Sequence, residues 1–215
     1  VLAPGSGLAR SLEVDRAMAR EDKEQVIELA SAVIADQVED RQGAYSDSLF
    51  HYIDTMMRDG RAKEAYDFLA GVRPEITQYD QVPSDINGLT TQWASIGTMS
   101  GFETFENRKA AWNEFTGRLD ELGFPWKKVP DSANYTWDYV INGEVEQAVD
   151  HVLSHDLNVP VSKNLGLHRN PLYPLFAPVY EDQRVAAKLF ERAERFAELR
   201  EDVRTMLQQP EWNNP

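Results

Sequence analysis

Cysteine is absent from this sequence of 215 residues. Disulfide bonds and cysteine-ligated zinc or iron–sulfur sites are therefore excluded. The absence is compatible with a cytoplasmic and with a periplasmic location, so the compartment stays open. The sequence also lacks a G-x-S-x-G nucleophile turn and a G-x-x-x-x-G-K-[ST] phosphate loop. We therefore expect neither nucleophilic nor nucleotide chemistry, and no cofactor.

Long apolar runs and strong basic clusters are missing as well. No apolar run approaches the ~20 residues that a membrane-spanning helix needs, so we expect no membrane insertion by this region. Acidic residues outnumber basic ones by 36 to 22, which gives a formal net charge of −14. The densest basic clusters, at 58–63 and 127–128, are short. Such a charge repels phosphate groups, so we expect this region to bind neither nucleic acid nor an anionic membrane surface.

Two segments far apart in the sequence share one helical pattern. Each starts with a glycine, Gly60 or Gly143, and continues with small or apolar residues at the same five offsets. These residues are Ala62, Ala65, Tyr66, Leu69 and Ala70 in the first segment, and Val145, Ala148, Val149, Val152 and Leu153 in the second. Glycine readily adopts the left-handed backbone of a tight turn, and a small alanine lets two helices approach closely. We predict that each glycine separates two helices that pack together.

The same pattern fits two further segments less closely and predicts about four helical pairs. Its small-residue markers are Ala30, Ala65, Ala111 and Ala148, at intervals of 35, 46 and 37 residues. The partner helices that should precede these segments cover 8–20, 46–58, 89–99 and 132–141. Stacked helical hairpins repeat at ~34 residues. The predicted fold class is therefore all-α, a right-handed solenoid of about four degenerate hairpins, with Ser46 as the N-cap of one first helix.

Composition divides the chain into three parts. Residues 1–7 (VLAPGSG) read as a linker, and their lack of a starting methionine suggests a portion of a longer protein. The helical repeats cover 8–160. Residues 161–215 hold an irregular, proline-containing segment and one long amphipathic helix over 182–208, in which Glu191 and Arg195 have the spacing of an ion pair. A solenoid needs a terminal cap, and this helix is predicted to be one.

Two stretches resemble a known family. Residues 139–157 (YVINGEVEQAVDHVLSHDL) resemble the second half of a tetratricopeptide repeat, and 168–189 (HRNPLYPLFAPVYEDQRVAAKL) resemble the closing segment of tetratricopeptide tails in bacterial signalling and transcription regulators. In those proteins the tail follows a winged-helix, adenylate cyclase or TolB-like region, in some across a membrane helix. One departure is that the first unit lacks its turn glycine. The resemblance implies repeats that bind a protein or peptide partner in a groove and carry no catalytic residues.

Four aromatic residues are the candidates for lining that groove. Tyr52 and Tyr135 hold equivalent places in the two best units and lie off the apolar faces of their helices. Trp93 and Tyr139 also lie on predicted first helices, which line the concave surface in helical-repeat proteins. These residues predict a surface that recognises an extended or helical peptide.

Two alternative functions remain open from the sequence. His151 and His155 lie one helical turn apart and could share a metal ion, as in a metal-dependent enzyme, although the glutamate of an HExxH motif is missing. Alternatively, the long final helix could serve a structural role and join two copies of the chain as a homodimer. The leading interpretation is a non-catalytic binding or sensing module.

Overall fold

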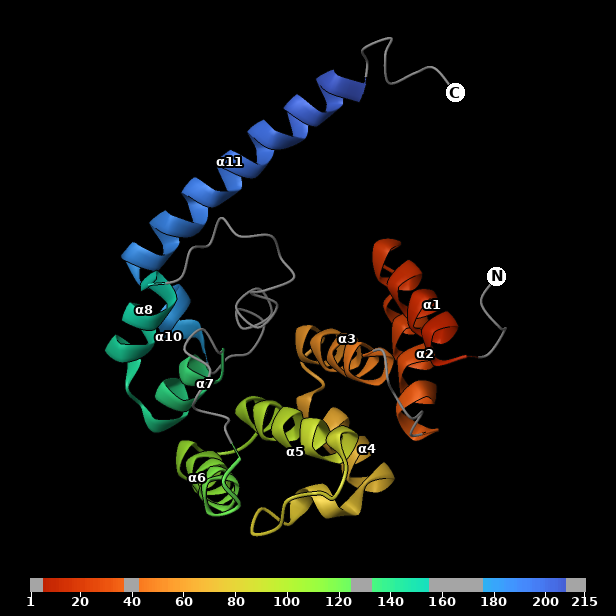
Figure 1. Cartoon of the computed structure of the whole chain (residues 1–215), viewed down its shortest axis with the longest axis vertical. Helices are drawn as coiled ribbons and strands as arrows, with labels where there is room; N and C mark the ends of the chain where they lie inside the picture. The colour runs from red at the N-terminus through yellow and green to blue at the C-terminus, as the bar shows by residue number, and fades with distance from the viewer. Residues whose placement is uncertain (1–5, 37–42, 125–132, 155–175, 208–215) are drawn as a thin grey trace. The chain divides into compact units, whose positions relative to one another are not determined.

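A computed structural model of the chain describes residues 6–36, 43–124, 133–154 and 176–207. All the regular elements in these ranges are helices, which confirms the predicted all-α class (Figure 1). The helices are α1 Gly7–Ala19, α2 Lys23–Ala35, α3 Ala44–Arg58, α4 Ala62–Val72, η1 Pro74–Thr77, α5 Ile86–Thr98, η2 Met99–Gly101, α6 Phe105–Glu121, α7 Ala133–Asn142, α8 Val145–Ser154, α10 Ala177–Tyr180 and α11 Gln183–Leu207. None of the helices described is long and apolar enough to cross a bilayer.

The chain divides into two compact units. Of the described residues, 6–36 and 43–124 belong to the first unit, and 133–154 and 176–207 belong to the second. This division falls inside the predicted repeat region of 8–160.

Helices α1, α2, α5 and α6 begin where the sequence supplies a side-chain cap. Ser6, Asp22, Asp85 and Thr104 each accept a hydrogen bond from the backbone N–H three residues later, which satisfies a donor that the first helical turn leaves open. Helix α3 is different, because it begins at Ala44 after Gly43 rather than after the predicted cap Ser46. A glycine at φ 82° makes the turn into this helix without a capping side chain.

The turns between paired helices follow the glycine prediction. Gly60 (φ 71°) and Gly143 (φ 82°) adopt the left-handed conformation that ends α3 and α7. In each turn the glycine N–H donates to the carbonyl of the residue three positions earlier. The N–H of the residue after the glycine donates to the carbonyl five positions before its own, and these two bonds form a Schellman motif. The α1–α2 turn has the same two bonds, but Glu21 (φ 56°) stands where the others have glycine.

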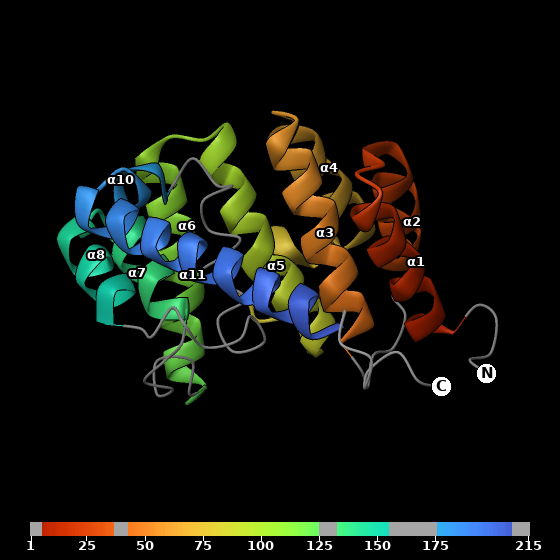
Figure 2. The same cartoon turned by 90° about the horizontal axis from the view of Figure 1, so that it is seen from above.

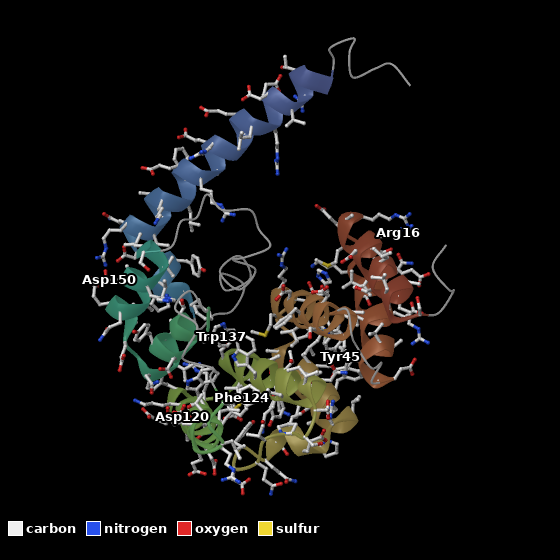
Figure 3. The ribbon with its side chains drawn as sticks, in the orientation of Figure 1. Arg16, Tyr45, Asp120, Phe124, Trp137 and Asp150 are labelled. Atoms are coloured by element: carbon white, nitrogen blue, oxygen red, sulfur yellow. The ribbon has the colours of Figure 1, made fainter. Side chains whose placement is uncertain are left out.

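Successive helices of the first unit pack in a recurring order. Helix α1 contacts α2 and α3, and α2 contacts α3. Helix α3 in turn contacts α4 and α5, and α4 contacts α5. Figure 2 shows α1 to α4 as neighbouring rods, and Figure 3 places Tyr45 of α3 inside this bundle. The fully buried core residues of these helices include Val14, Ala30, Ile34, Tyr45, Leu49, Ile53, Met56, Ala65 and Leu69.

The positions of the turns correct the alignment that the sequence suggested between the α1–α2 pair and the later helical pairs. Counted from the left-handed residue of each turn, Val26 of α2 occupies the place of Ala65 in α4 and Ala148 in α8. Ala30 lies one helical turn further along, although it is equally buried. The prediction that Ala30 is the equivalent of Ala65 is therefore wrong by one turn. A buried valine thus stands in the first pair where the other two pairs have a buried alanine.

The second unit is built on the α7–α8 hairpin. The ring of Trp137 meets the ring of Phe176 edge-on, with centroids 5.0 Å apart, and so joins α7 to the start of α10. Helix α11 packs on α8 and α10 through its first turns, where Val185 is fully buried. Beyond residue 192 all of its described side chains are exposed. Figure 1 shows α11 running well past α7, α8 and α10, so only its first part caps the hairpin.

Candidate peptide-binding hollow

A buried arginine fixes the connection between α4 and α5. The guanidinium of Arg73 is 7% exposed and donates two hydrogen bonds to the carboxylate of Asp85, at 3.0 and 2.6 Å. It also donates to Glu75, at 2.7 Å. Asp85 in addition caps α5 by accepting from the N–H of Gly88. The Arg73 guanidinium holds the pKa of Asp85 below its usual value, chiefly through these hydrogen bonds.

The segment that follows Arg73 carries Tyr79 against the next helices. The side-chain amide of Gln92, which is fully buried in α5, donates to the carbonyls of Gln78 and Gln81 at 3.0 and 3.1 Å. These two bonds hold the backbone on either side of Tyr79. The Tyr79 hydroxyl donates to the sulfur of Met99 at 3.4 Å. The position of this tyrosine is thus set by helix α5 and by η2.

Tyr79 forms one wall of a shallow hollow of about 310 Å³ in the first unit. The hollow lies between α4, the segment after η1, η2 and α6, and its polar and aromatic lining includes Tyr66, Tyr79, Glu103, Asn107 and Glu114. The two tyrosine hydroxyls are 3.0 Å apart. The side-chain amide of Asn107 donates to Glu103 at 2.9 Å, which orients that carboxylate.

The electrostatics of this hollow favour a cation. Among the described residues that line it there are two carboxylates, on Glu103 and Glu114, and no basic side chain. Burial, and then the hydrogen bond to Tyr66, raise the pKa of Tyr79 well above its usual value, so its hydroxyl stays neutral. Tyrosine rings attract cations through their faces, and carboxylates accept hydrogen bonds from ammonium and guanidinium groups. The arrangement therefore suits a lysine or arginine side chain.

Three of the four predicted groove residues have described side chains, and none of these three lines the hollow. Tyr52 is 3% exposed and its ring lies 5.0 Å from that of Phe68, so it is part of the α3–α4 core and offers a partner no surface. Trp93 is half-buried and meets Phe50 edge-on at 6.2 Å. The half-buried Tyr139 packs against His151 at 6.1 Å. The side chain of Tyr135 lies outside the described residues.

The predicted histidine pair is described only in part. The ring nitrogen Nδ1 of His151 lies 2.8 Å from the hydroxyl oxygen of Thr136, which is buried in α7. His155 lies outside the described residues. Within the ranges that the structure covers, no three histidine or acidic side chains come together in a way that could hold a metal ion.

The hollow cannot be predicted from the sequence pattern, because segments far apart in the chain build it. The segment 74–83 reads as a loop, and nothing in its pattern indicates that Tyr79 reaches Tyr66 and Met99. Comparisons with protein-family models, with curated proteins and with solved structures give no match for this chain. Its function must therefore be argued from its own residues.

Proposed function

We propose that this chain is a non-catalytic binding module that recognises a basic segment of a protein or peptide partner. Its fold would be a solenoid of tetratricopeptide-like hairpins within a larger bacterial regulatory protein. The observation that carries the proposal is the acidic and aromatic hollow beside Tyr79, in which the part of the lining that the structure describes has two carboxylates and no basic residue.

The packing of the first unit supports the solenoid part of the proposal. In a stack of helical hairpins, each first helix contacts its own second helix and the first helix of the next hairpin, and the second helix contacts that same neighbour. Helices α1 to α5 have these contacts twice in succession. The same Schellman bonds recur at Glu21, Gly60 and Gly143. Stacks of this kind commonly serve as binding surfaces for peptides.

The charge of the chain supports a basic partner. The hollow lies in a protein with a formal net charge of −14. Opposite charge steers a partner towards its site and suppresses wrong partners. The bound group would place its cation between Glu103 and Glu114 and its aliphatic stem against the ring of Tyr66.

A peptide array tests this function with the full chain as the probe. The array presents peptides of one length that are rich in lysine and arginine, uncharged, or acidic. We expect binding to be concentrated in the basic class. Equal binding to all three classes, or to none, would contradict the proposed function.

Two variants of α6 test the site with the best basic peptide. Glu114→Gln removes a carboxylate from the hollow, and we expect its affinity to fall by about three- to tenfold. Glu106→Gln makes the same change at an exposed position of α6 outside the hollow and serves as the matched control. If both variants bind as tightly as the wild type, the peptide binds elsewhere on the chain.

A further inference from the structure

The exposed part of α11 carries the spacing of a coiled-coil seam. The residues at 185, 189, 192, 196, 199, 203 and 206 alternate in steps of four and three, and six of these seven positions are apolar. This is the a/d pattern of a heptad repeat, with 189, 196 and 203 at a. Leu199 is 47% exposed and Val203 52% exposed. A sustained 3.5-residue seam that ends in exposed leucine and valine indicates a helical partner.

We infer that α11 pairs with α11 of a second copy of this chain, in antiparallel orientation. The inference goes beyond the proposed function, because it uses no residue of the hollow. The apolar seam lies on one helix and keeps one heptad register along its length. The same helix in a second copy of the chain therefore has a seam with matching spacing. The charges beside the seam decide the orientation.

Parallel pairing is disfavoured by two arginines. In a parallel coiled coil, the g position of one helix faces the following e position of the other. In α11 this places Arg195 at g against Arg200 at e of the second copy. Symmetry repeats the contact, so a parallel dimer has two like-charge pairs beside its seam.

One antiparallel register has opposite charges instead. Antiparallel helices place g against g and e against e. Three registers pair the a positions of one helix with the d positions of the other across the exposed half of α11. The first register places Arg195 opposite Arg195 of the second copy. The second places Asp202 opposite Asp202 of the second copy. The third sets Arg195 against Asp202, twice by symmetry, and has no like-charge pair. In this register Leu199 packs on position 196 of the second copy and Val203 on position 192.

The two residues are available for this contact. Arg195 and Asp202 are exposed. Within the described part of the chain neither has an ion-pair partner, and the predicted pair between Glu191 and Arg195 does not form.

Cysteine cross-linking tests orientation and register, because the natural chain has no thiol. Positions 192 and 203 are ~16 Å apart along one helix, too far for a disulfide within the chain. In the inferred register each faces the other across the seam. We expect the double variant Arg192→Cys/Val203→Cys to oxidise to a covalent dimer. The single variant Val203→Cys should not, because its two thiols would lie ~16 Å apart. Efficient cross-linking of the single variant would indicate parallel helices and overturn the inference.

Charge exchange supplies a second, independent test by sedimentation equilibrium. Arg195→Asp should weaken the dimer about tenfold, since two opposite-charge pairs become two like-charge pairs. Adding Asp202→Arg to the same chain should restore it. In a parallel dimer Arg195→Asp would strengthen association, because aspartate would then face Arg200. Arg204→Asp changes the net charge by the same amount as Arg195→Asp, but at a position outside the seam, and it serves as the control. A wild-type chain that remains monomeric at all concentrations would also overturn the inference, for example because α11 packs elsewhere on its own chain.

Discussion

At the residue scale, the Schellman turns that join α1 to α2, α3 to α4 and α7 to α8 form a natural comparison. Glu21, Gly60 and Gly143 hold equivalent left-handed positions, but only Glu21 has a side chain there. A left-handed backbone costs a non-glycine residue about 1–2 kcal/mol. Because Glu21 is exposed, its replacement removes no buried contact. We expect Glu21→Gly to raise the free energy of unfolding by about 0.5–1 kcal/mol in urea denaturation.

The converse change should have the opposite sign. A Cβ atom added to Gly60 would meet no atom within 4 Å, so Gly60→Ala tests backbone conformation alone. We expect it to lower the free energy of unfolding by about 1 kcal/mol. Gly117 of α6 is the matched control, since its Cβ would also meet open space but its backbone is helical. Gly117→Ala should stabilise the protein by up to about 1 kcal/mol, and destabilisation there would contradict this account.

The burial of Tyr52 predicts how the stability of the protein changes at alkaline pH. Burial, with a smaller contribution from Glu64, raises the pKa of Tyr52 to about 12, whereas an unfolded tyrosine titrates near pH 10. The folded state therefore holds this proton more tightly. The corresponding stability is fully present below about pH 10 and is lost as the pH rises towards 12.

The measurement is the free energy of unfolding against pH, with ultraviolet absorbance reporting phenol ionisation. Tyr52→Phe removes the proton and should make the loss of stability above about pH 10 less steep. Tyr45 and Tyr79, whose pKa values burial also raises, remain as internal references in the variant. An unchanged slope would show that the Tyr52 phenol ionises normally in the folded protein.

At the element scale, Arg73 joins α4, η1 and α5. Arg73→Met keeps an apolar stem in the buried site but removes the ion pairs with Asp85 and Glu75. Loss of one partner from a fully buried pair costs about 3–5 kcal/mol, but both carboxylates here are partly exposed and can be solvated. We therefore expect a loss of about 2 kcal/mol at neutral pH, measured by urea denaturation.

The same variant predicts a pH dependence. Because Arg73 lowers the pKa of Asp85, the stability from the pair is present above the ordinary aspartate pKa of about 4 and is lost as the pH falls through the depressed value. The difference in unfolding free energy between wild type and Arg73→Met should accordingly shrink below about pH 4. A difference that stayed constant into acid would mean that packing, not the ion pair, stabilises this connection.

The sequence predicted those parts of the fold that depend on local signals. The long helices that the structure describes, and the turns at Gly60 and Gly143, follow from apolar periodicity and from the need of glycine for a left-handed turn. The register of α2 was misjudged because Val26 and Ala30 are both apolar, so periodicity alone cannot distinguish them. The Arg73–Asp85 pair and the hollow depend on contacts between segments that have no common pattern. Tyr52 was expected in a groove because it lies off the apolar face drawn for its helix, whereas its side chain is buried against the next helix.

At the scale of the whole molecule, the net charge of −14 acts on any basic partner before contact. Long-range attraction raises the rate of association and is screened by salt, while contacts made after docking chiefly set the rate of dissociation. For a basic peptide selected on the array, we expect the association rate to fall about tenfold between about 0.05 and 0.5 M salt, measured by stopped-flow fluorescence. The dissociation rate should change much less.

The two glutamate variants separate the field of the molecule from the hollow. Glu106→Gln and Glu114→Gln reduce the net charge equally, so both should lower the association rate slightly and by similar amounts. Only Glu114→Gln removes a group that would contact the bound cation, so only this variant should speed dissociation. A salt-independent association rate would mean that the charge of the chain does not steer its partner. Equal dissociation rates for the two variants would place the peptide away from Glu114, even if the preference for basic sequences held.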